Sequence, residues 1–286
     1  MNNPIIMDGA MGSELIKRGT ILPRHTWSAH ANLERPDLVK TIHQEYIDAG
    51  AQIITANTFR ATPRSYKKTG LSMDLAIQKA YSSLNKAVQL AKQVAKENTI
   101  ILGSIAPLED CYKPELFPGK KTAESEFKMI IKWLLDAKVD GIILETMNSL
   151  AETAAVLNIL SDYHIPTYVS YYVKTAKQLP SHEPLSAAMS LLKNYEVTAL
   201  LFNCSPIATM NKVIDNMIKN YDGLWGVYPN LGEGQPSPDG AINVISSNNA
   251  FLNFINKSIN KGAKIIGACC GSSPNHIKLL NNKYNV

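Results

Sequence analysis

Residues 263–277, "AKIIGACCGSSPNHI", contain a short apolar run, two adjacent cysteines and the beginning of a helix. The run is too short for a typical helix and too continuously apolar for a strand with one exposed face, so it predicts a strand buried on both faces. Ser273 and Pro274 are typical of an N-cap and a first helical turn. We therefore expect Cys269 and Cys270 between a buried strand and a helix.

The same strand-then-helix pattern recurs along the chain. Similar apolar runs occupy residues 4–10, 51–59, 99–107, 139–147, 166–173, 198–206 and 224–230. Amphipathic helical patterns lie between them, for example at 35–51, with Pro36 near its start and Gly50 at its end. Eight such units predict an α/β fold, a (β/α)8 TIM barrel. A doubly wound open sheet is the alternative, but "DGAMGS" at 8–13 lacks the glycine pattern of a dinucleotide-binding crossover.

Composition limits the partners and the compartment. No break in composition marks a second domain, so we expect one barrel domain over residues 1–286. The longest basic cluster, "YKKTG" at 66–70, is too short to indicate a nucleic-acid partner. The N-terminus lacks the pattern of a secretory signal, and no apolar run is long enough to cross a bilayer. We therefore expect a cytoplasmic protein with small-molecule substrates and no membrane partner; its oligomeric state is not readable from the sequence.

The cysteines indicate a metal site. In a reducing compartment, four cysteines are more often thiols or metal ligands than disulfides. Cys204 ends the sixth apolar run, and Cys269 and Cys270 end the eighth, so all are expected on the active-site face of the barrel. Three thiolates predict a zinc (Zn²⁺) site with one position open to substrate. The alternative is that they are small core residues. Cys111 lies in a loop and is expected to be a non-ligand.

The other strand ends are unusually polar. They include Asp8, Asn57, Thr58, Ser104, Glu145, Thr146, Asn203 and Asn230. Glu145 closes an apolar run and needs a counter-charge if it is buried. Asp8 precedes a glycine and could hold a turn, while Asn57 and Thr58 could cap a helix. None of the six histidines ends a run, so a histidine-rich hydrolytic zinc site is not expected.

Several motifs together resemble the homocysteine S-methyltransferase family, which includes the betaine– and S-methylmethionine–homocysteine methyltransferases. They are "MDGAMGSELIKRG", "HQEYIDAGAQIITANTF", "GSIAP", "ILETMNSLAE", "FNCSP" and "IIGACCGSSPNHI", and they extend over nearly the whole chain. The resemblance implies that Cys204, Cys269 and Cys270 bind zinc. It implies that Asp8 and Glu145 receive the substrate ammonium and that Thr58 lies at a substrate-binding turn. It places Asn230 where a side chain can occupy the fourth zinc position when substrate is absent.

The resemblance also implies a reaction, the zinc-dependent transfer of a methyl group to homocysteine, giving methionine. Because the chain ends soon after the eighth unit, we expect a free donor, most readily S-methylmethionine or S-adenosylmethionine, with betaine as an alternative. The loops at 108–121 and 231–240 are expected beside the donor. Their candidate contact residues are Glu109, Tyr112, Glu233 and Asp239.

Two other functions fit parts of the sequence. A Schiff-base lyase would use Lys174, in "YYVKT" near the end of the fifth apolar run, but it leaves the three cysteines unexplained. A non-catalytic barrel that binds zinc or thiols would account for the cysteines. It would have no need of the acidic pair Asp8 and Glu145.

Overall fold

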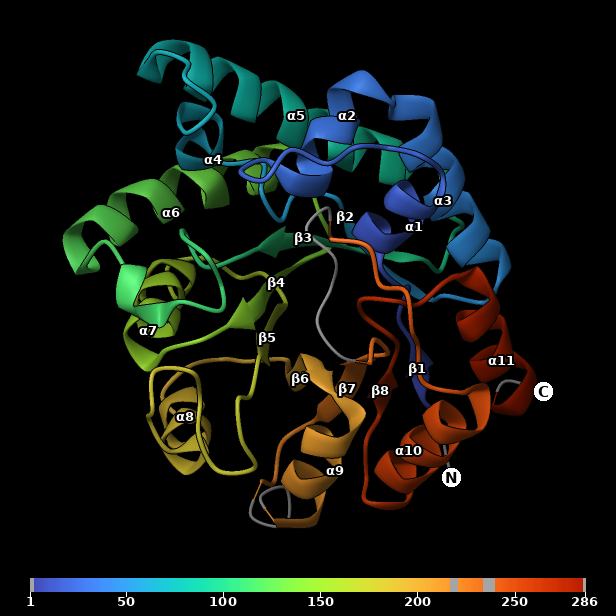
Figure 1. Ribbon diagram of the computed structural model, residues 1–286. Coiled ribbons are helices and arrows are strands. Elements are labelled where there is room, and N and C mark those ends of the chain that lie inside the picture. Colours follow the sequence, from blue (N-terminus) through green and yellow to red (C-terminus); the bar gives the residue numbers. More distant parts are fainter. Residues whose placement is uncertain (1–2, 217–220, 234–239, 285–286) are drawn as a thin grey trace.

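A computed structural model of the chain describes residues 3–216, 221–233 and 240–284. Within these ranges, eight parallel strands form one sheet in the order β1-β8-β7-β6-β5-β4-β3-β2, which curls into a nearly closed barrel (Figure 1). The strands are β1 (Ile5–Ile6), β2 (Ile53–Ala56), β3 (Ile100–Ile105), β4 (Gly141–Met147), β5 (Thr167–Tyr171), β6 (Ala199–Pro206), β7 (Trp225–Asn230) and β8 (Ile265–Ile266). Each lies inside one of the apolar runs, which confirms the predicted single-domain TIM barrel.

Helices surround the strands as the alternating pattern predicts (Figure 1). The longer ones are α3 (Pro36–Asp48), α5 (Met73–Val94), α6 (Lys120–Asp136), α7 (Leu150–Leu160), α8 (Leu185–Leu192), α9 (Ile207–Asn216), α10 (Asn248–Asn260) and α11 (Pro274–Tyr284). Short helices α1 (Met11–Lys17), η1 (Trp27–His30), α2 (Ala31–Glu34), α4 (Pro63–Lys67) and η2 (Pro114–Leu116) lie in the connections. In the described part of the chain, every helix is too short or too polar to span a membrane.

The core has two layers because side chains alternate along each strand. One layer packs between the sheet and the helices. The other fills the inside of the barrel with Met7, Ile53, Leu102, Ile143, Tyr168, Ala199, Leu201, Tyr228 and Ile265. A filled interior supports the barrel as a packed platform, and the strand ends above it remain free for function.

The barrel closes weakly between β1 and β2. A single bridge joins Met7 to Ile53, and the backbone N–H of Asp8 donates to the Ile53 carbonyl over 2.9 Å. Beyond that point, the Asp8 carboxylate accepts a hydrogen bond from the backbone N–H of Thr55 over 2.8 Å. The Asp8 side chain therefore continues the strand pairing where the backbone of β1 has left it.

Strands β4 and β6 are irregular at their carboxyl ends. The register shifts between Leu144 and Met147 in β4 and between Asn203 and Pro206 in β6. Thr146 (φ 59°) and Cys204 (φ 51°) have left-handed backbone conformations at these points. Such bulges redirect side chains near active sites. Regular alternation would direct Cys204 toward the helices; the bulge directs it to the barrel opening instead.

Candidate active site

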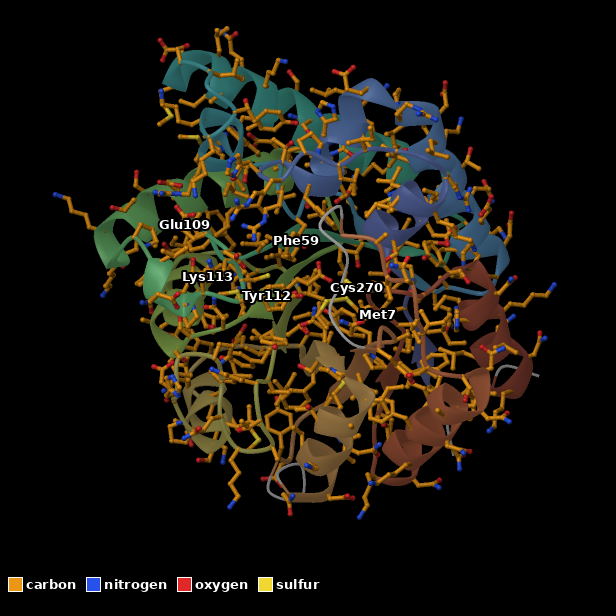
Figure 2. All side chains as sticks on the ribbon, in the orientation of Figure 1. Met7, Phe59, Glu109, Tyr112, Lys113 and Cys270 are labelled. Carbon is orange, nitrogen blue, oxygen red and sulfur yellow. A yellow bond between two sulfur atoms is a disulfide. The ribbon has the colours of Figure 1, made fainter. Side chains whose placement is uncertain are left out.

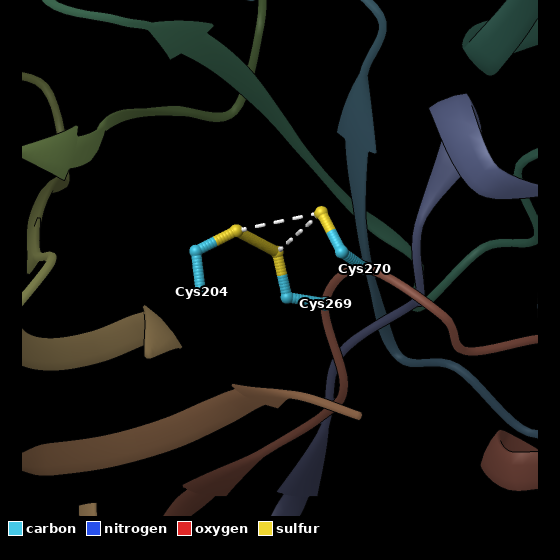
Figure 3. A group of neighbouring side chains, drawn as sticks. All are labelled: Cys204, Cys269 and Cys270. Carbon is cyan, nitrogen blue, oxygen red and sulfur yellow. Dashed lines mark hydrogen bonds between the residues drawn. A yellow bond between two sulfur atoms is a disulfide. The ribbon is translucent and has the colours of Figure 1, made fainter. Parts of the chain in front are cut away.

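Three sulfur atoms meet at the opening of the barrel (Figure 3). Cys204 comes from the bulged end of β6, and Cys269 and Cys270 follow β8, so the predicted convergence of the cysteines is present. All three Sγ atoms lie within 4.8 Å of one another. Cys204 and Cys269 form a disulfide, and Cys270 is a free thiol. Cys111 is buried outside this cluster.

The cluster suits a tetrahedral metal ion once its cysteines are reduced. Zinc–sulfur bonds of about 2.3 Å place two sulfur ligands roughly 3.8 Å apart. Cys270 Sγ lies 3.7 Å from Cys204 Sγ and 3.8 Å from Cys269 Sγ. A disulfide, by contrast, consumes two of the three thiolates. The sequence analysis favoured thiols over a disulfide, and for Cys204 and Cys269 the structure corrects this expectation. Three sulfur atoms that are close enough to bind one metal ion are also close enough for two of them to pair.

In the absence of a bound cation, the cluster favours the protonated thiol over the thiolate. Burial, and then the negative charge of Glu145, raise the pKa of Cys270 to about 11. A bound divalent ion reverses this preference because it deprotonates the thiols that coordinate it. The donor set, three cysteine sulfurs in a partly buried position, is one that zinc prefers.

Two carboxylates lie at the same opening: Asp8 follows β1, and Glu145 belongs to β4. Burial raises the pKa of Asp8 well above its usual range, and repulsion from Glu145 adds to the rise, while the Thr55 hydrogen bonds oppose it. Burial also raises the pKa of Glu145, although the Ser104 hydroxyl donates to it over 2.7 Å and opposes the shift. Two neighbouring acids that resist ionisation form a site that a cation would stabilise.

Tyr228 adds a hydroxyl that the sequence analysis did not identify. The side chain belongs to the interior layer of the barrel; burial, and then the charge of Glu145, raise the pKa of its hydroxyl. Within the described residues, no atom lies in hydrogen-bonding geometry to its buried hydroxyl. The available signal was its position in "VYPN", two residues before Asn230 and so on the same face of β7.

Thr58 and Asn230 occupy supporting positions. The Thr58 hydroxyl donates to the Ser104 carbonyl and accepts from the Ser104 N–H, each over 2.8 Å. Thr58, which follows β2, thereby holds this segment to β3 at Ser104, the residue whose hydroxyl donates to Glu145. The Asn230 amide oxygen accepts from the Gly232 N–H over 2.7 Å. Backbone hydrogen bonds from Cys269 to Pro229 and from Leu231 to Cys270 place Asn230 next to the sulfur cluster.

The loop between β3 and α6 is firmly attached beside the opening. The carbonyl of Cys111 accepts from the Asn148 amide over 3.1 Å. Glu109 pairs with Arg64 over 2.9 Å and also with Lys68. Tyr112, 51% exposed, packs edge-on to Tyr172 with ring centroids 5.0 Å apart. Figure 2 shows Tyr112 and Cys270 toward the middle of the barrel, with Glu109 farther out.

The remaining candidates lie apart from the sulfur cluster or outside the described residues. Glu233 accepts a hydrogen bond from Ser246 over 3.1 Å within its own loop, and Asp239 lies outside the described residues. Lys174 is exposed and lines a groove with Lys177 and Lys212. It therefore lacks the burial that the Schiff-base interpretation requires.

A parallel barrel with thiols and carboxylates at the carboxyl ends of its strands has reactive groups at the face where enzymes of this fold carry their active sites. The family model described as homocysteine S-methyltransferase matches residues 5–284. The chain belongs to the homocysteine S-methyltransferase family, so it is a methyltransferase whose acceptor is homocysteine.

Relatives from bacteria and plants agree with this family. The homocysteine S-methyltransferase of Escherichia coli is 28% identical, with 96% of this chain and 94% of the relative covered. A selenocysteine Se-methyltransferase of Brassica oleracea is 24% identical over 97% of this chain and 88% of its own. The structure of the homocysteine methyltransferase MmuM from Escherichia coli described as oxidized has a TM-score of 0.85 at 25% identity, covering 99% of this chain and 96% of that one. The form described as metallated has the same TM-score at 24% identity, covering 99% and 96% respectively.

Proposed function

We propose that this enzyme transfers a methyl group from a free sulfonium donor, S-methylmethionine or S-adenosylmethionine, to homocysteine, with zinc held by Cys204, Cys269 and Cys270. The observation that carries this proposal is the cluster of three sulfur atoms, in which both separations from Cys270 match those of thiolates around one zinc ion. Zinc bound there would lower the pKa of the homocysteine thiol so that it is ionised at neutral pH.

The carboxylates would hold the other end of homocysteine. Asp8 already accepts hydrogen bonds from both the backbone and the side chain of Thr55, whereas Glu145 accepts one from the Ser104 hydroxyl. Glu145 therefore keeps more acceptor capacity for an ammonium group, with Asp8 adding charge. An ammonium ion there would offset the burial that raises the pKa of both acids, so substrate binding would release protons.

The charges of the site favour a cationic donor. With zinc and homocysteine bound, four thiolates around one divalent ion would carry a net negative charge, which attracts an onium compound. Glu109 is already paired with Arg64 and Lys68, so the adjacent wall offers aromatic rings rather than a free carboxylate. Tyr112 and Tyr172 can stabilise a sulfonium through cation–π contacts. In the transfer, the donor carbon–sulfur bond breaks, the methyl group bonds to the homocysteine sulfur, and the donor leaves as a neutral thioether.

A donor panel tests this function. Protein reduced with a dithiol and loaded with zinc would be incubated with homocysteine and methyl-labelled S-methylmethionine, S-adenosylmethionine or betaine. Labelled methionine should form with a sulfonium donor and be lost in Cys204→Ser, while Cys111→Ser, a buried thiol outside the cluster, should retain activity. Activity with betaine alone would reassign the donor. Zinc binding without turnover would support the non-catalytic barrel.

Domain organisation enters the same proposal. The match over residues 5–284 supports the whole chain, residues 1–286, acting as one homocysteine-binding domain that supplies methionine. Limited proteolysis with and without homocysteine tests this, because a single domain should be protected cooperatively over its whole length.

A further inference from the structure

Asn203 lies directly before Cys204 and connects two strands of the active site. Its side chain is fully buried in β6. The amide oxygen accepts hydrogen bonds from the Thr146 backbone N–H over 3.2 Å and from the Ser170 hydroxyl over 2.8 Å. The amide nitrogen donates to the Thr146 hydroxyl over 2.8 Å. One side chain therefore binds both the backbone and the side chain of Thr146, across β5.

The chain neighbours of Asn203 and Thr146 include two residues that take part in the proposed reaction. Cys204 follows Asn203, and Glu145 precedes Thr146. Thr146 and Cys204 each have a positive φ angle, a conformation that is disfavoured for residues other than glycine and most of all for β-branched ones. Such conformations persist only where the surroundings hold them. The Asn203 amide provides that support at the position where both strands lose their regular register.

We propose that Asn203 is a positioning residue that couples the sulfur side of the site to its carboxylate side. It holds the two left-handed residues in fixed relation, so that Cys204 Sγ and Glu145 face the same space. The metal-related part of this inference rests on the proposed zinc-dependent function. The alternative is that Asn203 only satisfies buried polar groups, in which case its loss would lower stability and leave the cluster geometry unchanged.

Cobalt(II) binding to the reduced protein separates these roles, because thiolate-to-cobalt absorption reports how many cysteines bind the ion. In Asn203→Ala, cobalt affinity should fall roughly 10–100-fold, the usual cost of removing a residue that orients a metal ligand. The absorption per cobalt should fall by about a third if Cys204 no longer binds, as one of three thiolates is lost. Thr146→Val should weaken affinity by less, and Thr146→Ser, which keeps the hydroxyl, should restore it.

Thr153→Val provides a matched control. Thr153 is also fully buried, and its hydroxyl donates over 2.7 Å to the carbonyl of Ser149, the N-cap of α7. It should lower stability while cobalt affinity and absorption remain those of the wild type. If Asn203 acts through Thr146, the Asn203→Ala/Thr146→Val double variant should bind cobalt no more weakly than Asn203→Ala alone.

A metal-free measurement tests the positioning separately from the zinc proposal. At a fixed ratio of glutathione disulfide to glutathione, the oxidant takes two electrons from Cys204 and Cys269, and these cysteines form their disulfide. Asn203→Ala should form it with an effective concentration roughly tenfold smaller, because Cys204 is no longer held in place. If the wild-type protein with cobalt shows no cobalt–thiolate absorption bands, this result contradicts the zinc proposal and leaves the positioning role to be decided by the disulfide measurement. A folded Asn203→Ala variant with an unchanged disulfide equilibrium and unchanged cobalt binding would overturn the positioning role. If Asn203→Ala does not fold, the same two measurements on Thr146→Val decide whether the positioning role holds.

Discussion

The two ends of β4 and β6 differ sharply. In their first halves the strands are regular and direct Ile143 and Leu201 into the apolar interior of the barrel. At their carboxyl ends both strands shift register and place polar or sulfur-bearing residues in left-handed conformations. Regular geometry thus coincides with packing, and irregular geometry coincides with the candidate chemistry. Changes at the two ends should therefore have separable effects, on stability at one end and on the site at the other.

Removing a sulfur from the cluster should have the largest effect. In Cys270→Ser, zinc affinity and kcat/KM should fall by more than about 100-fold, since loss of a ligand exceeds the cost of losing a residue that supports one. The thermal midpoint of the metal-free protein should change little. Metal analysis and methionine formation measure the first effect, and calorimetry measures the second. An active, zinc-loaded Cys270→Ser protein would contradict the proposed ligand set.

The opposite result is expected at the regular end. Ile143→Ala leaves a cavity in the barrel interior, where Ile143 is fully buried, and should lower the free energy of unfolding by about 2–5 kcal/mol. Zinc stoichiometry should remain that of the wild type at temperatures where the variant is folded. Urea unfolding and metal analysis together make the check. If Ile143→Ala lost its metal without losing stability, the proposed separation of effects between the two ends of the strands would be wrong.

Glu145→Gln should affect substrate binding more than turnover. Replacing a charged acceptor by an amide removes about 1.5–3 kcal/mol of interaction with the homocysteine ammonium, which raises its KM roughly 10–100-fold. In the wild type, KM should fall as pH rises through the raised pKa of Glu145, and this dependence should weaken in the variant. Initial rates at a series of pH values measure both; an unchanged KM would refute the assignment.

The same substitution should change the pH dependence of stability. Above the ordinary pKa of 4.5 for Glu145, the unfolded chain has lost a proton that the folded protein retains, because burial raises the pKa in the folded state. The free energy of unfolding therefore falls as pH rises through this window, until the folded carboxyl ionises. Subtracting the Glu145→Gln curve from the wild-type curve isolates this slope. If the wild-type free energy of unfolding minus that of Glu145→Gln increased with pH, the result would contradict a raised pKa of Glu145 in the folded state.

The smallest effect is expected at the aromatic wall. Tyr112→Leu removes a ring that faces the opening, and a cation–π contact contributes about 0.5–1 kcal/mol at an exposed position. The KM for a sulfonium donor should rise about two- to fivefold, while the KM for homocysteine stays constant. Tyr112→Phe keeps the ring and should behave as the wild type. Equal changes in both KM values would place Tyr112 outside the donor position.

The regular end of the barrel was predictable from sequence, and the irregular end was predictable only in part. Every predicted apolar run contains a strand because continuous burial leaves a local pattern. The convergence of Cys204 with Cys269 followed from strand order. The orientation of Cys204 did not, because the bulge depends on contacts with Thr146 on another strand. Tyr228 has the character of a core aromatic residue, and its position beside Glu145 becomes apparent only when β7 and β4 are placed around one axis.

Asp8 links the closure of the barrel between β1 and β2 to the charge of the ligand that the barrel binds. Its carboxylate holds the Thr55 N–H at the joint where β1 meets β2 through a single bridge. An ionised carboxylate accepts this hydrogen bond more strongly than a protonated one. If the substrate ammonium binds beside Asp8 as proposed, it should keep Asp8 ionised, tighten the joint and slow hydrogen–deuterium exchange at the Thr55 amide. The barrel would be most tightly closed while the enzyme is occupied, and it would loosen each time product leaves.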